Sequence, residues 1–268
     1  MRENTSRILK VIESATVYMP TNGPSSVLSG KTDQWAVAVE DSSFPLKVAV
    51  LIPALNASAT IVDLVQGIRD YVPRENIFVV DDGSTDGTDQ LAWEAGAVVL
   101  HHRKNRGKGA ALRTGFQAII KGNYHGVIVL DADGQHERRF IPDFLRQARR
   151  ADSDILIGSR MRRVGQMPWV RVLTNKITSA CISALAGQKI PDSQSGYRYI
   201  RADVLKKLRL RTTHYDTESE MLIQAGRKGY RIGFVSISSI YQGEKSSIRA
   251  GRDTLRFLFL VVKSFFSL

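Results

Sequence analysis

The sequence predicts an α/β fold with a mainly parallel central sheet and helices on both faces. Three observations lead to this prediction. Beyond Lys47, short apolar runs of strand length alternate with segments whose apolar residues recur at helical spacing. Strands that alternate with helices imply right-handed crossovers and parallel pairing. Three of the expected strands end in unusual polar clusters, and such sheets bind ligands beyond the carboxyl ends of their strands.

The expected elements follow in chain order. Five apolar runs are expected to form strands: Val48–Ile52, Ile77–Val80, Ala97–Leu100, Val127–Leu130 and Ile155–Ile157. The helices between them are one that carries Ile61, Leu64, Val65 and Ile68, and those near Asp89–Ala95, Gly109–Lys121 and Arg139–Arg150. After Arg160 the alternation weakens, and the expected elements are three helices: Trp169–Leu185, Asp216–Gly226 and Arg252–Leu268.

The chain divides into three parts. Residues 1–45 are an N-terminal extension of mixed polar residues that we expect to be loosely attached, 46–251 form one domain, and 252–268 form an amphipathic helix. A length of 268 residues with an apolar fraction of 43% is enough for a sizeable core. Cys181 is the single cysteine, which excludes an intrachain disulfide and a zinc site of several cysteines. A reducing compartment fits this usage.

The formal net charge of +12 implies an anionic partner: nucleic acid, a phosphorylated substrate or an anionic membrane. The sequence has no helix-turn-helix, zinc pattern or RNP-like aromatic strand, so we expect no nucleic-acid binding. It also has no secretory signal and no apolar run of spanning length. We therefore expect a cytoplasmic protein that is soluble or peripheral on the cytoplasmic face of a membrane. Whether it forms a homo-oligomer is left open.

The segment LDADGQH (Leu130–His136) directly follows the fourth expected strand. An extended backbone would point the carboxylates of Asp131 and Asp133 the same way. A cation would relieve their repulsion, and hard oxygen ligands suit Mg²⁺ or Mn²⁺. Gln135 continues the spacing and would add another oxygen. A polar turn that closes the strand is the alternative, and the position at a strand end favours the metal.

Two more strand ends carry polar groups. In VVDDGSTDGT (Val79–Thr88) the turn residues need no function, but two acids at the end of a buried strand are unusual. We expect Asp82 to accept hydrogen bonds from a base or ribose. In PALN, Pro53 is expected to end the first strand and Asn56 to cap the helix that follows.

The segment KNRGKG places Gly107 and Gly109 on either side of Lys108 at an expected helix start. Free backbone N–H groups and the helix dipole attract anions there. The segment is not a Walker A loop, because Gly109 occupies the position of the required Ser or Thr. A solvated basic loop is the alternative, and this motif alone favours it.

These segments, in this order, resemble the family-2 glycosyltransferases of the GT-A fold, and among them the polyprenyl-phosphate (dolichyl-phosphate) mannose and glucose synthases. The resemblance covers about Lys47–Phe259 and rests on an ordered set of motifs: VLIPALN, VVDDGSTDGT, NRGKGAA, LDADGQH, GSRM and DSQSGYR. It implies an inverting, metal-dependent transferase that takes a hexose from a nucleotide-diphosphate sugar of the GDP-mannose or UDP-glucose type. The acceptor would be a polyprenyl phosphate, such as dolichyl or undecaprenyl phosphate, at an anionic membrane surface.

The resemblance also implies roles for single residues. Asp131, Ala132 and Asp133 match the DXD motif, whose carboxylates, with Gln135, would hold the metal on the donor diphosphate. Asp131, Asp133 and Arg160 are the expected catalytic residues. The expected nucleotide-sugar site comprises residues from all these motifs: Pro53, Leu55, Asn56, Val80, Asp82, Lys108, Asp131, Ala132, Asp133, Gln135 and Arg160.

On the acceptor side, Arg160, Arg171 and Asn175 would bind the acceptor phosphate. Asp192–Arg198 matches the family segment D-x-x-S-G-F-R, with Tyr197 in place of Phe, and Glu218 and Glu220 match an acidic pair. The chain departs from many relatives before the terminal helix, where Gln242 and Ile248 stand in place of basic residues. Lys245 or Arg249 are the candidates to replace those phosphate contacts.

A phosphate acceptor needs no general base, because a phosphate monoester already carries about −1.5 to −2 charges near pH 7. Cationic positioning by Arg160 and Arg171 is sufficient. A saccharide or protein hydroxyl is the alternative acceptor and would need a base such as Asp133, Glu218 or Glu220. The wide apolar face of Arg252–Leu268 suits a helix at a membrane interface, with a core helix or a dimer contact as the alternative. A nucleotide-binding scaffold without activity is a further alternative.

Overall fold

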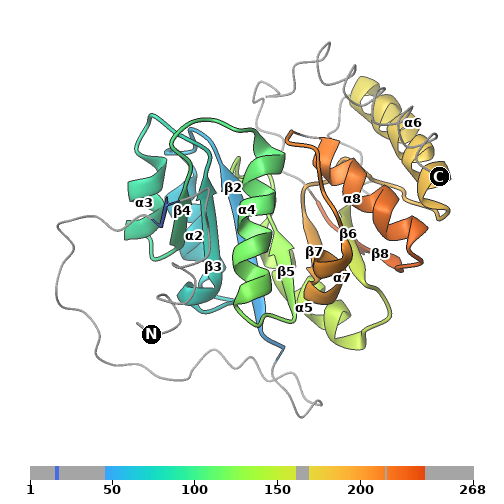
Figure 1. Ribbon diagram of the computed structural model, residues 1–268, viewed down its shortest axis with the longest axis horizontal. Helices are drawn as coiled ribbons and strands as arrows, with labels where there is room; N and C mark the ends of the chain where they lie inside the picture. Colours follow the sequence, from blue (N-terminus) through green and yellow to red (C-terminus); the bar gives the residue numbers. More distant parts are fainter. Residues whose placement is uncertain (1–15, 18–45, 161–168, 215, 239–268) are drawn as a thin grey trace.

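The structure, a computed structural model, describes residues 16–17, 46–160, 169–214 and 216–238. Its centre is one sheet with the strand order β1-β4-β3-β2-β5-β7-β6-β8 (Figure 1). The strands are β1 Thr16–Val17, β2 Val48–Ala54, β3 Ile77–Asp81, β4 Val98–His101, β5 Gly126–Val129, β6 Ile155–Ser159, β7 Arg198–Arg201 and β8 Ile232–Ser236. Only β1 and β7 run antiparallel to their neighbours, so the prediction of a mainly parallel sheet is confirmed.

Helices cover both faces of the sheet (Figure 1). The α-helices are α2 Ile61–Ile68, α3 Thr88–Glu94, α4 Lys108–Lys121, α5 Ile141–Arg150, α6 Trp169–Ala186, α7 Ala202–Lys207 and α8 Asp216–Arg227. Two short 3₁₀ helices are η1 Arg74–Asn76 and η2 Arg138–Phe140. Successive side chains of a strand point to opposite faces. Leu51 and Val80 therefore pack with residues of α4, α6 and α8, whereas Ile52 and Val79 pack with residues of α2, α3 and α5.

The elements expected in the described part of the chain are present, and their ends differ from the expected ones by at most two residues. β7, α7 and β8 were not expected. The sequence pattern did not predict β7 (RYIR), because an arginine stands at each of its ends and the first of them, Arg198, is buried. The expected terminal helix, Arg252–Leu268, lies outside the described residues, as do Gln242, Lys245, Ile248 and Arg249.

Two expectations for the end of β2 are wrong. β2 continues through Pro53 to Ala54, and Pro53 pairs in register with Val80. Beyond Leu51 the strand pairs only with β3, so the missing N–H of Pro53 is tolerated on the unpaired side. Asn56 caps no helix, because Thr60 is the N-cap residue of α2.

The N-terminal extension contributes one described element. Thr16 and Val17 form β1, which pairs with His101 and Leu100 of β4 and is the outermost strand on that side of the sheet. This short antiparallel pair attaches the extension to the domain at one place. None of the helices in the described ranges is both long enough and apolar enough to cross a lipid bilayer.

Candidate active site

The carboxyl ends of β2, β3, β4, β5 and β6 all lie at one edge of the sheet, because these strands run in the same direction. The chain order reverses between β2 and β5: β3 and β4 lie on one side of β2, and β5 lies on the other. Such a reversal leaves a crevice at the strand ends where ligands bind. The expected site residues that follow these strands therefore gather at this edge, as the sequence predicted.

Asp131 and Asp133 follow β5 at this edge. The backbone turns from Ala132 to Gly134, and Gly134 has a φ of 73°, so the expected extended geometry is wrong. The backbone N–H of Gln135 donates to Asp133 Oδ1 at 2.9 Å, and Thr60 Oγ1 donates to the carbonyl of Ala132 at 2.6 Å. The DXD motif is thus a tight turn fastened to the start of α2.

The two carboxylates of the DXD motif influence each other. Burial and the negative charge of Asp131 together raise the pKa of Asp133 above its usual value. Burial alone would raise the pKa of Asp131 too, but the attraction of Lys108 and then of His136 outweighs it and lowers this pKa to about 2. Two carboxylates in mutual repulsion supply oxygen ligands of the kind that Mg²⁺ or Mn²⁺ prefers, and the side-chain oxygen of Gln135 would add a third.

Lys108 approaches the DXD motif from α4. Its Nζ lies 2.6 Å from Asp131 Oδ1 and 3.3 Å from Glu218 Oε2 of α8. Burial opposes the charged ammonium, but Asp131 and Glu218 overcome this effect and raise the pKa of Lys108. The lysine that the sequence assigned to the nucleotide-sugar site is therefore an ion-pair partner of the DXD motif itself.

The glycines beside Lys108 are explained by close packing. A Cβ on Gly107 would overlap the carbonyl oxygen of Thr213, and a Cβ on Gly109 would overlap Thr217 Oγ1. Gly107 also has a φ of 94°, which favours glycine. The N–H of Ala110 donates to the Thr213 carbonyl and that of Gly107 donates to Asp82 Oδ2, so these two amides are already used within the protein. At this expected anion site, the N–H groups of Gly107 and Ala110 are therefore hydrogen-bonded to the protein itself.

The expected nucleoside-binding residues meet at the ends of β2 and β3. Pro53 pairs with Val80, and the N–H of Asp82 donates to the Ala54 carbonyl at 2.8 Å. Asn56 has a φ of 50°, and its side-chain oxygen accepts the N–H of Thr85 at 3.0 Å. Leu55 is 44% exposed above this junction. The PALN and DDGST segments therefore form one connected surface.

Asp82 is buried and holds the loop that follows β4. Its carboxylate lies 2.7 Å from His102 Nδ1 and accepts the backbone N–H groups of Arg106 at 3.0 Å and Gly107 at 2.7 Å. His102 Nε2 in turn lies 2.9 Å from Thr114 Oγ1. This carboxylate anchors the NRGKG segment. Its expected contact with a base or ribose stays a prediction.

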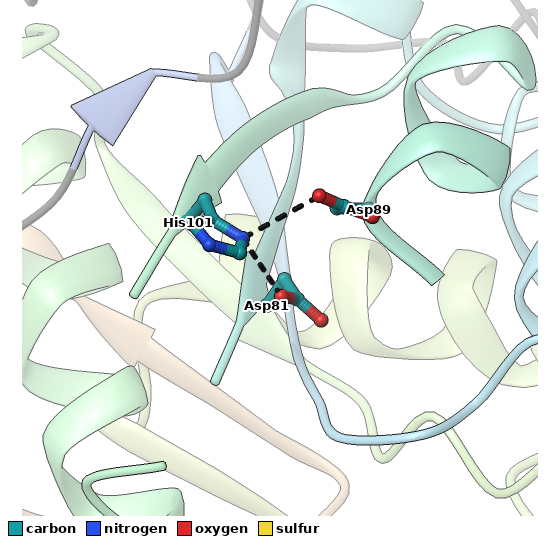
Figure 2. Close-up of side chains that lie close together, drawn as sticks. All are labelled: Asp81, Asp89 and His101. Carbon is teal, nitrogen blue, oxygen red and sulfur yellow. Dashed lines mark ion pairs between the residues drawn. The ribbon is translucent and has the colours of Figure 1, made fainter. Parts of the chain in front are cut away.

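A separate cluster lies where β3, β4 and α3 meet (Figure 2). His101 Nδ1 lies 3.0 Å from Asp81 Oδ2 and 3.5 Å from Asp89 Oδ2. Asp81 is the last residue of β3, and the contacts of this cluster are to β4 and α3 rather than to the DXD motif, which follows β5. When His101 is protonated, these ion pairs tie the two strands to α3.

Arg160 directly follows β6 and pairs with Asp192. Its Nε and Nη2 donate to the two oxygens of Asp192, both at 2.9 Å, and its backbone N–H donates to the same carboxylate at 3.0 Å. Asn175 of α6 donates to Asp192 at 2.8 Å and accepts from Ser179 at 2.9 Å. Burial opposes ionisation of Asp192, but the bonds from Arg160 and Asn175 lower its pKa. Asn175 is buried behind this pair, and the side chain of Arg171 lies outside the described atoms.

Glu218 and Glu220, the acidic pair of α8, have different partners. Glu220 accepts the backbone N–H groups of Arg211 and Thr212, at 2.9 and 3.0 Å, and the hydroxyl of Thr212 at 2.8 Å. Glu218 faces Lys108 instead, and its Oε1 is buried without a hydrogen-bond partner among the described residues. Residues two apart on a helix point in different directions, which explains the division.

Arg198 and Gly196 support the DXD motif from behind, and sequence reasoning did not single them out. The Arg198 guanidinium is fully buried and donates to the carbonyls of Ser195, Glu218 and Ser193, at 2.7, 2.9 and 2.7 Å. A Cβ on Gly196 would overlap the Asp131 carboxylate. The match to D-x-x-S-G-F-R was the available signal for both residues.

We expect Gly196→Ala to weaken Mn²⁺ binding at least about tenfold, because the new methyl group displaces Asp131. Isothermal titration of metal-free protein with Mn²⁺ measures the effect. Gly122→Ala is the matched control: its Cβ would crowd the Tyr124 ring at the end of α4, away from the site. Equal Mn²⁺ affinity in the two variants would contradict the assigned role of Gly196.

Comparisons with known proteins identify the family and the fold. The model of glycosyl transferase family 2 matches residues 49–209. The chain is 32% identical to an undecaprenyl-phosphate mannosyltransferase of Micrococcus luteus, over 73% of this chain and 84% of that protein. It is 34% identical to a polyprenol monophosphomannose synthase of Mycolicibacterium smegmatis, over 60% of this chain and 64% of that protein.

Among solved structures, the fold is similar to that of glucosyl-3-phosphoglycerate synthase from Mycobacterium tuberculosis in complex with Mn²⁺, uridine diphosphate and glucosyl-3-phosphoglycerate. The TM-score is 0.64 at 21% identity, and the match covers 82% of this chain and 79% of that one. This likeness confirms the predicted GT-A fold. The family model covers more than half of the sequence, and the chain therefore belongs to glycosyl transferase family 2.

Proposed function

We propose that this chain transfers a hexose from a nucleotide-diphosphate sugar to a polyprenyl phosphate at the cytoplasmic face of a membrane. The observation that carries the proposal is the pair of DXD carboxylates at the carboxyl edge of the sheet. In the strand order they lie between the PALN–DDGST surface, which follows β2 and β3, and Arg160, which follows β6. The polyprenyl-phosphate acceptor is supported by the names of the relatives.

The proposed reaction is a single displacement. The acceptor phosphate oxygen forms a bond to the anomeric carbon of the sugar, and the bond to the donor diphosphate breaks. The nucleoside diphosphate leaves with the bonding electron pair. Because the acceptor attacks from the face opposite the leaving group, the anomeric centre is inverted. Asp131, Asp133 and Gln135 would hold Mg²⁺ or Mn²⁺, which would neutralise charge on the leaving group.

The protein's own groups supply the rest. Pro53, Leu55, Asn56, Val80 and Asp82 form the surface proposed for the nucleoside. Arg160, oriented by Asp192, places a fixed positive charge near the reacting phosphates. No proton has to be removed from a phosphate acceptor, so this reaction needs no general base.

A donor and acceptor screen tests the proposal. Radiolabelled GDP-mannose, UDP-glucose and UDP-N-acetylglucosamine are each offered with undecaprenyl or dolichyl phosphate and Mn²⁺ or Mg²⁺. The expected product is labelled lipid that extracts into organic solvent. Parallel reactions offer 3-phosphoglycerate and a neutral saccharide. Transfer to one of these, with none to the lipid phosphate, would refute the proposed acceptor.

The membrane part of the proposal is supported by the outer face of α6, which lies at the periphery beside α8 (Figure 1). Trp169, Leu173 and Ile177 recur at helical spacing on this face and are 75%, 50% and 58% exposed. Lys176 is exposed on the same helix. An apolar row with basic residues beside it suits an anionic lipid surface.

We expect Leu173→Glu to weaken binding to vesicles of anionic phospholipid at least about tenfold, because it replaces a membrane-facing apolar group with a repelled charge. Co-sedimentation of the full chain measures the change. Gln117→Glu adds the same charge at an exposed position on α4 and should bind like the unaltered chain. Identical binding by the two variants would exclude this face of α6 as the membrane contact.

A further inference from the structure

The ion pair between Lys108 and Asp131 bears directly on metal binding. The side chains of Lys108, Asp131 and Glu218 are 16%, 24% and 11% exposed, so water screens these charges only in part. A distance of 2.6 Å between Lys108 Nζ and Asp131 Oδ1 is short for an ion pair. The first carboxylate of the DXD motif is therefore neutralised by a residue of the chain itself.

Lys108 is held in this place by the backbone around it. The close approach of Gly107 and Gly109 to residues 213–217 fixes the start of α4 against the start of α8. Glu218, on the first turn of α8, then holds the ammonium from its second side. The lysine is placed opposite Asp131 by two packed helices.

Arg198, the buried arginine near Lys108, makes a different set of contacts. Each of the three nitrogen atoms of the Arg198 guanidinium donates to a backbone carbonyl, and its recorded bonds go to no carboxylate. Arg198 therefore stabilises the loop behind Asp131, whereas Lys108 is the ion-pair partner of the carboxylate. Loss of Lys108 would therefore remove the ion pair of Asp131 while the loop behind it keeps its support.

We propose that Lys108 is a positioning residue that competes with the divalent cation for Asp131 and thereby makes tight metal binding depend on the donor diphosphate. This inference rests on the proposed metal-dependent function. A divalent cation and an ammonium at one carboxylate repel each other, which weakens binding of the metal alone. A donor diphosphate adds negative charge beside both cations and relieves this repulsion.

The test measures metal binding rather than turnover. Metal-free full-length chain is titrated with Mn²⁺, with and without GDP or UDP, and free Mn²⁺ is followed by electron paramagnetic resonance. Lys108→Met should raise the affinity for Mn²⁺ alone at least about tenfold. It should also reduce the gain in Mn²⁺ affinity that the nucleoside diphosphate gives the unaltered chain. Lys108→Arg retains the charge and should restore both properties.

Two further variants complete the experiment. Lys108→Gln removes the charge but keeps a hydrogen-bond donor for Asp131 and Glu218, so it provides the same test if the Met variant does not fold. Lys121→Met removes an equal charge from the exposed end of α4 and should bind Mn²⁺ like the unaltered chain. If the neutral variants Lys108→Met and Lys108→Gln bind Mn²⁺ like Lys121→Met, the inference is overturned while the proposed function stands. If the unaltered chain binds no Mn²⁺ with or without nucleotide, the metal-dependent function itself is wrong.

Discussion

Asp133→Ala is expected to reduce the rate of sugar transfer about 1,000-fold, since loss of a preorganised charge-stabilising group has an effect of this size. The change should leave the fold intact. Asp133 lies in the turn after β5 and outside the two packed cores, and in the metal-free protein burial and repulsion by Asp131 raise its pKa. Removal of this repulsion should leave the unfolding temperature of the metal-free protein unchanged or slightly higher.

The measurement combines initial rates at saturating Mn²⁺ with thermal unfolding in the presence of a chelator. Asp152→Ala is the matched control, because Asp152 is an exposed acid in the turn between α5 and β6. It should retain the activity and the unfolding temperature of the unaltered chain. Undiminished transfer by Asp133→Ala, or transfer at full rate in metal-free buffer, would refute the metal assignment.

Arg198→Met is expected to lower the free energy of unfolding by about 3–5 kcal/mol, because three buried carbonyls each lose a charged donor, at a cost of about 1–3 kcal/mol apiece. The variant leaves the carbonyls of Ser193, Ser195 and Glu218 buried without their donor. Arg198→Lys should restore only part of the loss, because a lysine ammonium cannot reproduce the planar fork of three bonds.

Urea unfolding followed by circular dichroism measures this loss. Arg150→Met removes an exposed arginine at the end of α5 and should change the free energy of unfolding by less than about 0.5 kcal/mol. A loss below about 1 kcal/mol for Arg198→Met would mean that the three carbonyls find other partners. The role of Arg198 as the support of the DXD loop would then be wrong.

The parts of the fold that the sequence predicted are those that depend on local patterns. Apolar runs such as Val48–Ile52 mark strands that are buried on both faces, and parallel pairing brings their carboxyl ends to one edge. Asp131, Asp82 and Arg160 each follow such a strand, so their meeting at this edge could be expected before the structure was known. The resemblance to family 2 added the DXD motif and the DSQSGYR segment.

The contacts that escaped prediction join residues far apart in the chain. Lys108 meets Glu218, which lies 110 positions away, and nothing in either local sequence specifies that partner. Gly196 gave no sign that its missing side chain leaves room for Asp131. β7 was overlooked because Arg198 is polar, yet it is buried where three carbonyls satisfy its charge. Local patterns carry little information about partners of this kind.

The Arg160–Asp192 pair also constrains the segment between β6 and β7. It joins the two ends of the excursion that leaves the sheet after β6 and returns before β7, with α6 between them. The ion pair holds the residues on either side of α6 close to the sheet, so a change on the outer part of α6 need not move the sheet. We therefore expect substitutions on the exposed face of α6 to leave the spacing of the strand ends at the site unchanged.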